Sequence, residues 1–195
     1  MGRFALAAAL SAVMALPAAA EVSLNEVSQY FGAFRTGKAQ FTQVNGDGSI
    51  ATGTLYIRRP GRMRFEYDPP LDQLVLAGGG QVAIFDGRSN TTAEQYPLSE
   101  TPLSIILAEN VDLARSGMVT AHTSDGTTTS VTAQDPQRPE IGSIKMVFTE
   151  NPVELRQWVT TNSTGEQTTV ILGELERGGD FPPSTFSIEV AKQRQ

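Results

Sequence analysis

The residues of this chain that offer distinctive chemistry are arginines, four of which lie in one segment, Gly53–Asp68, with the sequence GTLYIRRPGRMRFEYD. The alternating side chains and the turn signal Pro60-Gly61 predict two antiparallel strands joined as a hairpin. A guanidinium group keeps its charge at physiological pH and presents five hydrogen-bond donors in a planar fork. The chemistry to consider at this hairpin is therefore the binding of hydrogen-bond acceptors by arginine.

The loop length of the hairpin decides which of its side chains share a face of the sheet. A two-residue loop would mix apolar and charged side chains on both faces. A three-residue loop, Pro60–Arg62, separates them far better, and we prefer it. Its apolar face then carries Leu55, Ile57, Arg59, Met63, Phe65 and Tyr67, and the opposite face carries Thr54, Tyr56, Arg58, Arg64 and Glu66.

Arg59 is the only charged residue on the apolar face in this register. Burying an unpaired guanidinium is very costly, so its side chain must reach either water or hydrogen-bond acceptors. One interpretation is an arginine at a strand end whose head group extends to solvent. The other is a latch, meaning an arginine side chain that binds backbone carbonyls of a helix covering the sheet.

Signals for catalysis or metal binding are weak throughout the chain. His122 is the only histidine and there is no cysteine, so neither a zinc site nor a Ser-His triad can be assembled. Gly32–Ala39 resembles a P-loop but lacks the final hydroxyl residue and follows a helical pattern, and Asn45–Ser49 lacks the glutamate of a calcium loop. We expect a protein that is not an enzyme and that has no cofactor and no metal.

The first twenty residues have the features of a secretory signal peptide, with Arg3 before an apolar run, Phe4–Leu16, and small residues up to Ala20. Thirteen apolar residues span about 20 Å as a helix, too short for a hydrocarbon core of about 30 Å. We expect cleavage after Ala20 and one domain, residues 21–195. The formal net charge of −6 disfavours nucleic acid and anionic membrane surfaces as partners.

Secondary-structure signals predict a mainly β protein. Leu24–Phe34 has helical spacing, with Ser23 and Glu26 as a capping box, and Pro102–Glu109 is a second apolar helix that Thr101 can cap. About eleven strands fill most of the rest, and the chain ends soon after the last of them. We expect an open, incomplete antiparallel β-barrel with helices covering its cavity.

At the hairpin the sequence resembles the LolA family of periplasmic lipoprotein carriers. The block Arg58–Pro70 carries the most specific part of the resemblance. Weaker matches follow in the family's order: Ala39–Gln43, Gly53–Ile57, Gln73–Leu76 and Thr101-Pro102. Together they cover nearly all of the chain after residue 20. Met63 and Phe65 stand where the family commonly has an aromatic residue and tryptophan, and both departures keep an apolar wall.

The resemblance implies a half-open barrel, lidded by helices, whose hydrophobic cavity holds the acyl chains of lipoproteins. The family's lid-locking arginine falls on Arg59, and its partners on the lid helix fall near Leu107 and Ala108. The residues expected to line the cavity are Leu55, Ile57, Met63, Phe65, Tyr67, Leu74, Leu76, Leu103, Ile106 and Leu107. The implied partners are lipoproteins, the inner-membrane transporter LolCDE and the outer-membrane receptor LolB, and we expect a monomer located in the periplasm.

Two other functions remain open at this point. The same fold could serve as a periplasmic lipid-sensing regulatory module that binds an anti-sigma factor, although such proteins usually carry a second domain. A secreted hydrolase is disfavoured because no catalytic constellation is present. The receptor LolB is itself a lipoprotein, and the absence of cysteine argues against that identity.

Overall fold

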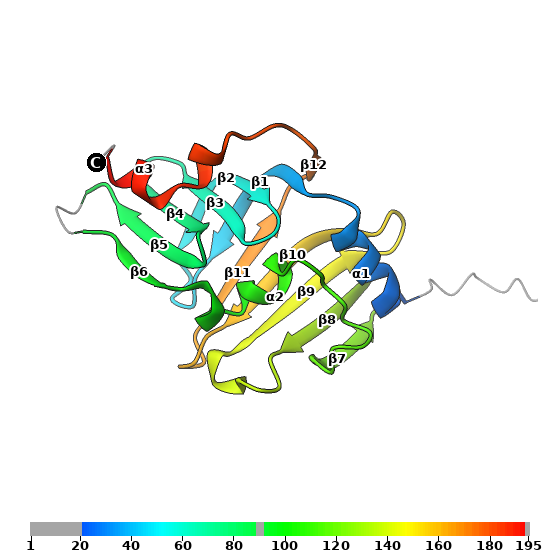
Figure 1. Cartoon of the computed structure of the whole chain (residues 1–195). Helices are drawn as coiled ribbons and strands as arrows, with labels where there is room; N and C mark the ends of the chain where they lie inside the picture. The colour runs from blue at the N-terminus through cyan, green and yellow to red at the C-terminus, as the bar shows by residue number, and fades with distance from the viewer. Residues whose placement is uncertain (1–20, 89–91, 194–195) are drawn as a thin grey trace, which may run out of the picture.

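A computed structural model of the chain describes residues 21–88 and 92–193 (Figure 1). The expected signal peptide, residues 1–20, lies outside the described residues. The main element is one sheet of twelve strands in the order β6-β5-β4-β3-β2-β1-β11-β10-β9-β8-β7, with β12 paired to β1. Every pairing is antiparallel, and the end strands β6 and β7 do not pair with each other, so the barrel is open.

The strands have the following bounds: β1 Thr36–Val44, β2 Ile50–Arg58, β3 Arg62–Tyr67, β4 Gln73–Gly78, β5 Gln81–Asp86, β6 Glu94–Pro97, β7 Val119–Ser124, β8 Thr128–Gln134, β9 Ser143–Thr149, β10 Glu154–Thr161, β11 Gln167–Leu172 and β12 Glu176–Arg177. The sequence predicted about eleven strands. The difference is β12, whose two residues are too short for an alternating pattern to reveal.

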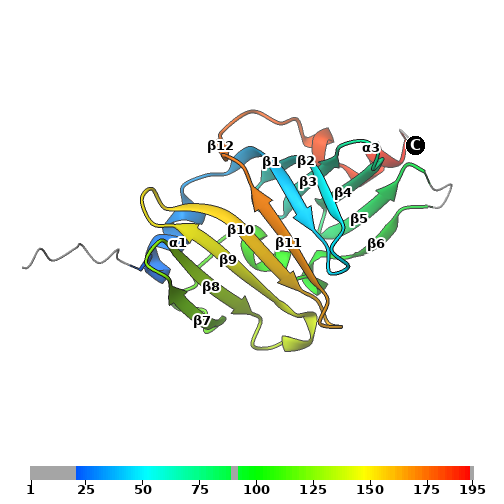
Figure 2. The same ribbon diagram turned by 180° about the vertical axis from the view of Figure 1, so that it is seen from behind.

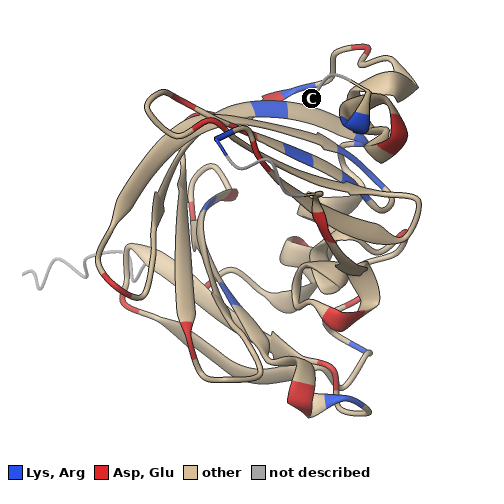
Figure 3. Cartoon of the chain, turned by 90° about the vertical axis from the view of Figure 1, so that its left-hand side faces the viewer, with Lys and Arg blue, Asp and Glu red and all other residues tan. Residues whose placement is uncertain are grey.

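The sheet curls around its inner face (Figures 2 and 3). Two helices, α1 (Leu24–Gly32) and α2 (Leu103–Leu107), lie on this inner side, and a third, α3 (Ile188–Lys192), packs on the outer side (Figure 1). Three 3₁₀ turns connect other elements: Leu98–Glu100, Pro139–Ile141 and Pro183–Phe186. None of the helices in the described segments is both long and apolar enough to cross a membrane.

Helix α1 begins as the sequence predicts. The hydroxyl of Ser23 accepts a hydrogen bond from the backbone N–H of Glu26, and the Glu26 carboxylate accepts one from the backbone N–H of Ser23. This capping box satisfies two backbone donors that the helix itself leaves free. Helical spacing then places Val27, Tyr30 and Phe31 on the face buried against the sheet.

The hairpin β2–β3 has the two faces that the sequence predicted, but its loop lies one residue earlier. Arg58 pairs with Arg62, so the three-residue loop is Arg59–Gly61 and not Pro60–Arg62. The pairs Leu55–Phe65 and Ile57–Met63 share the inner face. The faces agree because the two registers differ by an even number of residues, which leaves every side chain on the same side.

The second lid helix differs from its prediction at the N-terminus. The hydroxyl of Thr101 donates to the carbonyl of Leu98, and no side chain caps the N-terminus of α2, so the predicted Thr101 cap is wrong. A tight 3₁₀ turn directly precedes α2, and it gives Thr101 a nearer acceptor than the helix. The helix also ends at Leu107, earlier than the expected Glu109.

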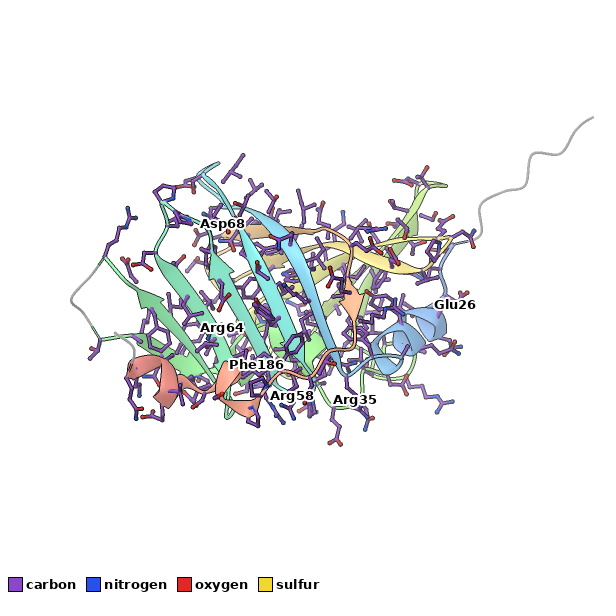
Figure 4. All side chains as sticks on the ribbon, turned by 90° about the horizontal axis from the view of Figure 1, so that it is seen from above. Glu26, Arg35, Arg58, Arg64, Asp68 and Phe186 are labelled. Atoms are coloured by element: carbon purple, nitrogen blue, oxygen red, sulfur yellow. The ribbon has the colours of Figure 1, made fainter. Side chains whose placement is uncertain are left out.

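The C-terminal part of the chain continues well beyond the last strand, which corrects the expected early end. A C-terminal strap, residues 178–192, crosses the outer face of β2–β5 and ends in α3 (Figure 4). Arg58 donates to the carbonyl of Phe181 over 2.6 Å, and Arg64 donates to that of Thr185 over 3.1 Å. Two outward-facing arginines of the hairpin therefore hold the strap.

We expect Gly78→Ala to loosen the C-terminal strap, because a methyl group at this position would overlap the carbonyl oxygen of Phe186. A carbonyl oxygen cannot rotate away as a side chain could, so the whole strap segment around Phe186 must shift away from β4. Limited proteolysis of residues 178–192 should then become at least several-fold faster. Gly32→Ala is the matched control, because a methyl group there meets nothing within 4 Å. Equal proteolysis of the two variants would contradict this packing.

Candidate functional site

The inner face of the sheet carries a continuous apolar wall. Leu55, Ile57, Met63 and Phe65 of the hairpin are all at least nine-tenths buried in the main hydrophobic cluster, and Tyr67 packs against it while partly exposed. These five side chains share one face because antiparallel pairing aligns alternate residues of β2 and β3. The structure thus brings together the hairpin residues expected to line a cavity.

Aromatic rings extend this wall across the centre of the sheet. The ring of Phe65 lies 5.1 Å from that of Phe41 on β1 and 6.3 Å from that of Trp158 on β10, both close to edge-on. Tyr67 is 5.2 Å from Phe41, again edge to face. Such contacts add to the free energy gained from burying apolar area, so the wall is well packed.

The two lid helices close the wall from the other side. Phe31 of α1 and Ile106 and Leu107 of α2 are each at most 3% exposed and join the same cluster, while Leu103 packs against it partly buried. The described structure places the expected lid residues of α2 over the expected hairpin wall. Helix α2 has only five residues, too few to be stable without this packing.

Arg59 is the one charged residue that lines the small cavity at this junction, and it joins both lids to the hairpin. Its guanidinium donates to the carbonyl of Phe31 in α1 and, over 2.9 Å, to the carbonyl of Ala108 directly after α2. We call Arg59 and these two carbonyls the latch. The residue is 5% exposed, so its head group does not extend to solvent.

The surroundings of Arg59 compensate only part of the cost of burying its charge. Its guanidinium carbon lies 5.5 Å from the ring centre of Phe31 and 5.9 Å from that of Phe34, which places a cation near two aromatic faces. Its Nε has no hydrogen-bond partner among the described residues. Burial lowers the pKa of Arg59, and the nearby positive charge of Arg35 acts in the same direction. Arg59 still remains charged, because arginine does not lose its proton in proteins.

The backbone of the hairpin loop adds to the latch. The N–H of Gly61 donates to the carbonyl of Leu107 over 2.9 Å, and the N–H of Arg59 donates to the carbonyl of Arg35 over 2.7 Å. The resemblance suggested Leu107 as a partner of the Arg59 side chain. In the structure its carbonyl is bound by the backbone of the loop instead. Phe31, which the sequence did not suggest as a partner, takes that place.

Between the lids and the hairpin wall, the described residues leave little free space. A cavity between the two lids and the wall has a volume of about 10 Å³ and is lined by Ile57, Arg59, Met63, Ile106, Leu107 and seven further residues, among them Trp158. Ligand pockets usually measure about 300–1,000 Å³. A volume of about 10 Å³ is enough for at most one water molecule, so no acyl chain fits in this cavity as it stands. A second pocket, of about 510 Å³, is lined mainly by residues of α2 and of the segment that follows it, among them Ile105 and Leu113 of the main hydrophobic cluster and Val111 and Met118 packed against it.

Leu74 and Leu76 do not belong to the inner wall, which corrects their expected place. Leu74 pairs with Glu66 and Leu76 with Arg64, and both partners face outward. The two leucines instead pack beneath α3 in a second cluster with Ala83, Phe85, Ile188 and Ala191. On β4 it is Val75 and Ala77 that share the inner face with Phe65 and Met63.

Several residues of the interior were absent from the sequence-based set. They come from α1 and the segment directly after it, from β10 and β11, and from the segment after β11: Tyr30, Phe31, Phe34, Leu155, Leu172 and Leu175. The apolar stripe of the first helix and the alternation of the late strands were visible in the sequence. They did not reveal which of these residues meet the hairpin, because that depends on contacts between distant segments.

We expect the free energy of unfolding to fall between pH 10 and pH 12 because of Tyr67. Burial raises the pKa of Tyr67 to about 12 from 10.0, and its hydroxyl donates to Gln43 over 2.7 Å. The folded state thus favours the neutral phenol, and this stabilisation is complete below pH 10 and lost as the pH rises through about 12. Urea titrations at pH 10 and pH 12 measure this loss. Between these pH values the free energy of unfolding of Tyr67→Phe should fall by about 2 kcal/mol less than that of the wild-type protein. Equal pH dependence of both proteins would contradict a buried phenol.

An open antiparallel sheet with an apolar inner face, closed by helices that a buried arginine holds, defines a lidded half-barrel. The chain belongs to a family of this class: residues 33–189 match the family model described as "Outer membrane lipoprotein carrier protein LolA". The described residues thus have the open barrel that the resemblance implied.

Relatives of similar length support this membership. The outer-membrane lipoprotein carrier protein of Chromobacterium violaceum is 27% identical over 193 residues, covering 95% of this chain and 92% of that protein. The protein of the same name from Chromohalobacter salexigens is 26% identical over 207 residues, covering 97% and 95%. A solved structure, a putative outer membrane lipoprotein-sorting protein domain from Vibrio parahaemolyticus, has a TM-score of 0.54 at 8% identity and covers 88% of this chain and 98% of that one. This likeness concerns the fold alone.

Proposed function

We propose that this protein is a periplasmic carrier that holds the acyl chains of lipoproteins between its sheet and its lids. The observation that carries the proposal is the apolar interior, which is sealed by two short helices and fixed by one buried arginine. The lipoprotein-carrier relatives of nearly full length support it. We further propose that residues 1–20 direct export and are removed, leaving one domain.

Acyl chains explain why such an interior must open. Each buried methylene contributes about 0.8 kcal/mol, so one long chain contributes on the order of 10 kcal/mol and does not leave a membrane readily unaided. The closed cavity of about 10 Å³ cannot hold a chain. Loading between the lids and the hairpin wall therefore requires α1 and α2 to separate from this wall.

The latch gives this carrier a way to release its cargo. In the closed state the Arg59 side chain binds Phe31 and Ala108, and the wall packs on the lids instead of on acyl chains. Closure thus competes with the cargo and lowers the affinity of the carrier for it. A carrier needs this property, because it must pass its cargo on to the next acceptor.

We propose LolCDE as the donor and LolB as the acceptor of the lipoprotein. The test uses membrane vesicles that contain the transporter, ATP and a triacylated lipoprotein, to which the purified chain is added. After sedimentation of the vesicles, lipoprotein should remain in the supernatant in a complex with the chain. The supernatant complex should then transfer its cargo to LolB embedded in a second set of vesicles.

A matched pair of variants makes this test specific for the interior. Leu55→Asp places a charge on the inner wall, whereas Ile50→Asp places one on the same strand at a side chain that is 67% exposed. Only the first should abolish recovery of the soluble complex. Recovery that is unchanged by a folded wall variant, or absent for the wild-type chain, would exclude the carrier function.

A further inference from the structure

One end of the central strands gathers six of the 15 lysines and arginines of this acidic chain. The pairs Thr36–Arg58, Arg58–Arg62, Tyr56–Arg64, Lys38–Tyr56 and Gly37–Arg177 place them on adjacent positions of β12, β1, β2 and β3. We call this set, with Arg35 directly before β1, the basic end: Arg35, Lys38, Arg58, Arg62, Arg64 and Arg177. Arg58 and Arg62 flank the loop that contains Arg59, and the carbonyl of Arg35 accepts from its N–H, so the basic end lies beside the latch.

Acidic residues occupy the opposite end of the same strands. The turn after β1 contains Asp47, and the turn between β3 and β4 contains Asp68 and Asp72, while β5 ends at Asp86. Figure 4 shows Asp68 at one end of the strands and Arg35 and Arg58 at the other. The sheet therefore carries opposite charges at its two ends, with the positive end at the lids.

Most charges of the basic end are not neutralised by ion pairs within the described segments. Arg64 pairs with Glu66 at 2.6 Å, while the other five cations form no ion pair within 4 Å among the described residues. Glu176 lies across from Lys38 and reduces the positive charge without cancelling it. Five of the six side chains are carried by paired strands, which fix the spacing of their backbone positions.

We propose that the basic end is a docking surface for a carboxylate-rich surface of the protein that exchanges cargo with this carrier. This inference rests on the proposed function. Arginines on a rigid framework suit carboxylates, which they bind through two parallel hydrogen bonds. The opposed charges of the two ends would orient the carrier during approach, so that the lids meet the partner first.

An anionic membrane fits these observations less well than a protein. The chain as a whole has a net charge of −6 and is repelled by an extended negative surface, whereas a partner of limited size meets only the basic end. Membrane attraction usually comes from clustered lysines and arginines in segments beside a bilayer or on amphipathic helices. Here the cations lie on strands and several are already oriented by aromatic rings or carbonyls.

The experiment measures the association rate of the lipopeptide-loaded carrier with the soluble part of LolB and with the periplasmic domain of LolC. The double variant Lys38→Glu, Arg62→Glu reverses two charges of the basic end and leaves Arg35, the neighbour of the latch, unchanged. The control Arg88→Glu, Lys145→Glu changes the net charge equally at exposed positions elsewhere. Each rate is measured at ionic strengths of about 0.01 M and about 0.15 M, where charges act over about 30 Å and about 8 Å.

For at least one partner, the basic-end variant should associate about tenfold more slowly at low ionic strength, and the control less than twofold. The wild-type rate should fall with salt, and the rate of the basic-end variant should not. Equal effects of both variants would overturn the proposal, as would a basic-end variant that loses only its binding to vesicles of phosphatidylethanolamine and phosphatidylglycerol. If the wild-type chain, the basic-end variant and the control variant all bind lipopeptide equally, the carrier function stands whatever the association rates show. If it does not bind the wild-type chain, both proposals fail.

Discussion

Arg59→Leu should retain bound lipopeptide and pass it to LolB about 10- to 100-fold more slowly than the wild-type protein. The substitution removes two hydrogen bonds from a charged donor, to Phe31 and Ala108, and each such bond contributes about 1.5–3 kcal/mol. Without them the closed state loses its advantage over the loaded state, so the cargo is held more tightly. The measurement is the rate at which a fluorescent triacylated lipopeptide moves from the carrier to LolB.

Arg58→Leu is the matched control for this prediction. Arg58 is the sequence neighbour of Arg59 and also donates to a backbone carbonyl, that of Phe181, but on the outer face of the sheet. Its removal should loosen the C-terminal strap. At a saturating concentration of LolB, where docking through the basic end does not limit transfer, it should leave the transfer rate within about twofold. If Arg59→Leu released its cargo at the wild-type rate, or if both variants slowed release equally, the latch would have no role in release.

Phe65→Ala should lower the free energy of unfolding by about 3–5 kcal/mol, the usual cost of removing a buried phenyl ring. Phe65 is 6% exposed and contacts the rings of Phe41, Tyr67 and Trp158 at the centre of the wall. Urea denaturation followed by circular dichroism measures the effect, and the slope with denaturant should stay unchanged.

Ile171→Ala serves as the control for the wall, because this side chain is 42% exposed on the outer face of β11. Its removal should cost less than about 0.5 kcal/mol, as is usual for surface positions. A loss below about 1 kcal/mol for Phe65→Ala would mean that the interior is not closed and packed as the structure shows it.

The sequence predicted the faces of the hairpin and the unusual place of Arg59, because both follow from alternation within one short segment. It could not predict Phe31 as a partner of Arg59, since a backbone carbonyl leaves no trace in the residue type. The same limit applies to Ala108, which was expected as a partner of Arg59 only because of the resemblance to the LolA family.

Leu74 and Leu76 show a second limit of sequence patterns. Strand β4 is apolar on both faces, because the C-terminal strap covers its outer side. A run of apolar residues buried on both faces carries no alternation that would tell one face from the other. Helix α3, with five residues, is also too short to be recognised from its spacing. What the sequence missed is therefore the part of the fold that depends on contacts between distant segments.

Trp158 provides the most direct test of the claim that acyl chains enter the interior. It is the only tryptophan of the chain, is 1% exposed, and lies on the wall beside Phe65 and the closed cavity. The measurement is the fluorescence of Trp158 during titration with a triacylated lipopeptide whose acyl chains carry bromine, a quencher that acts only at short range. The account predicts strong quenching that saturates at one lipopeptide per protein. Saturable binding of the lipopeptide that leaves the fluorescence of Trp158 unquenched would contradict it.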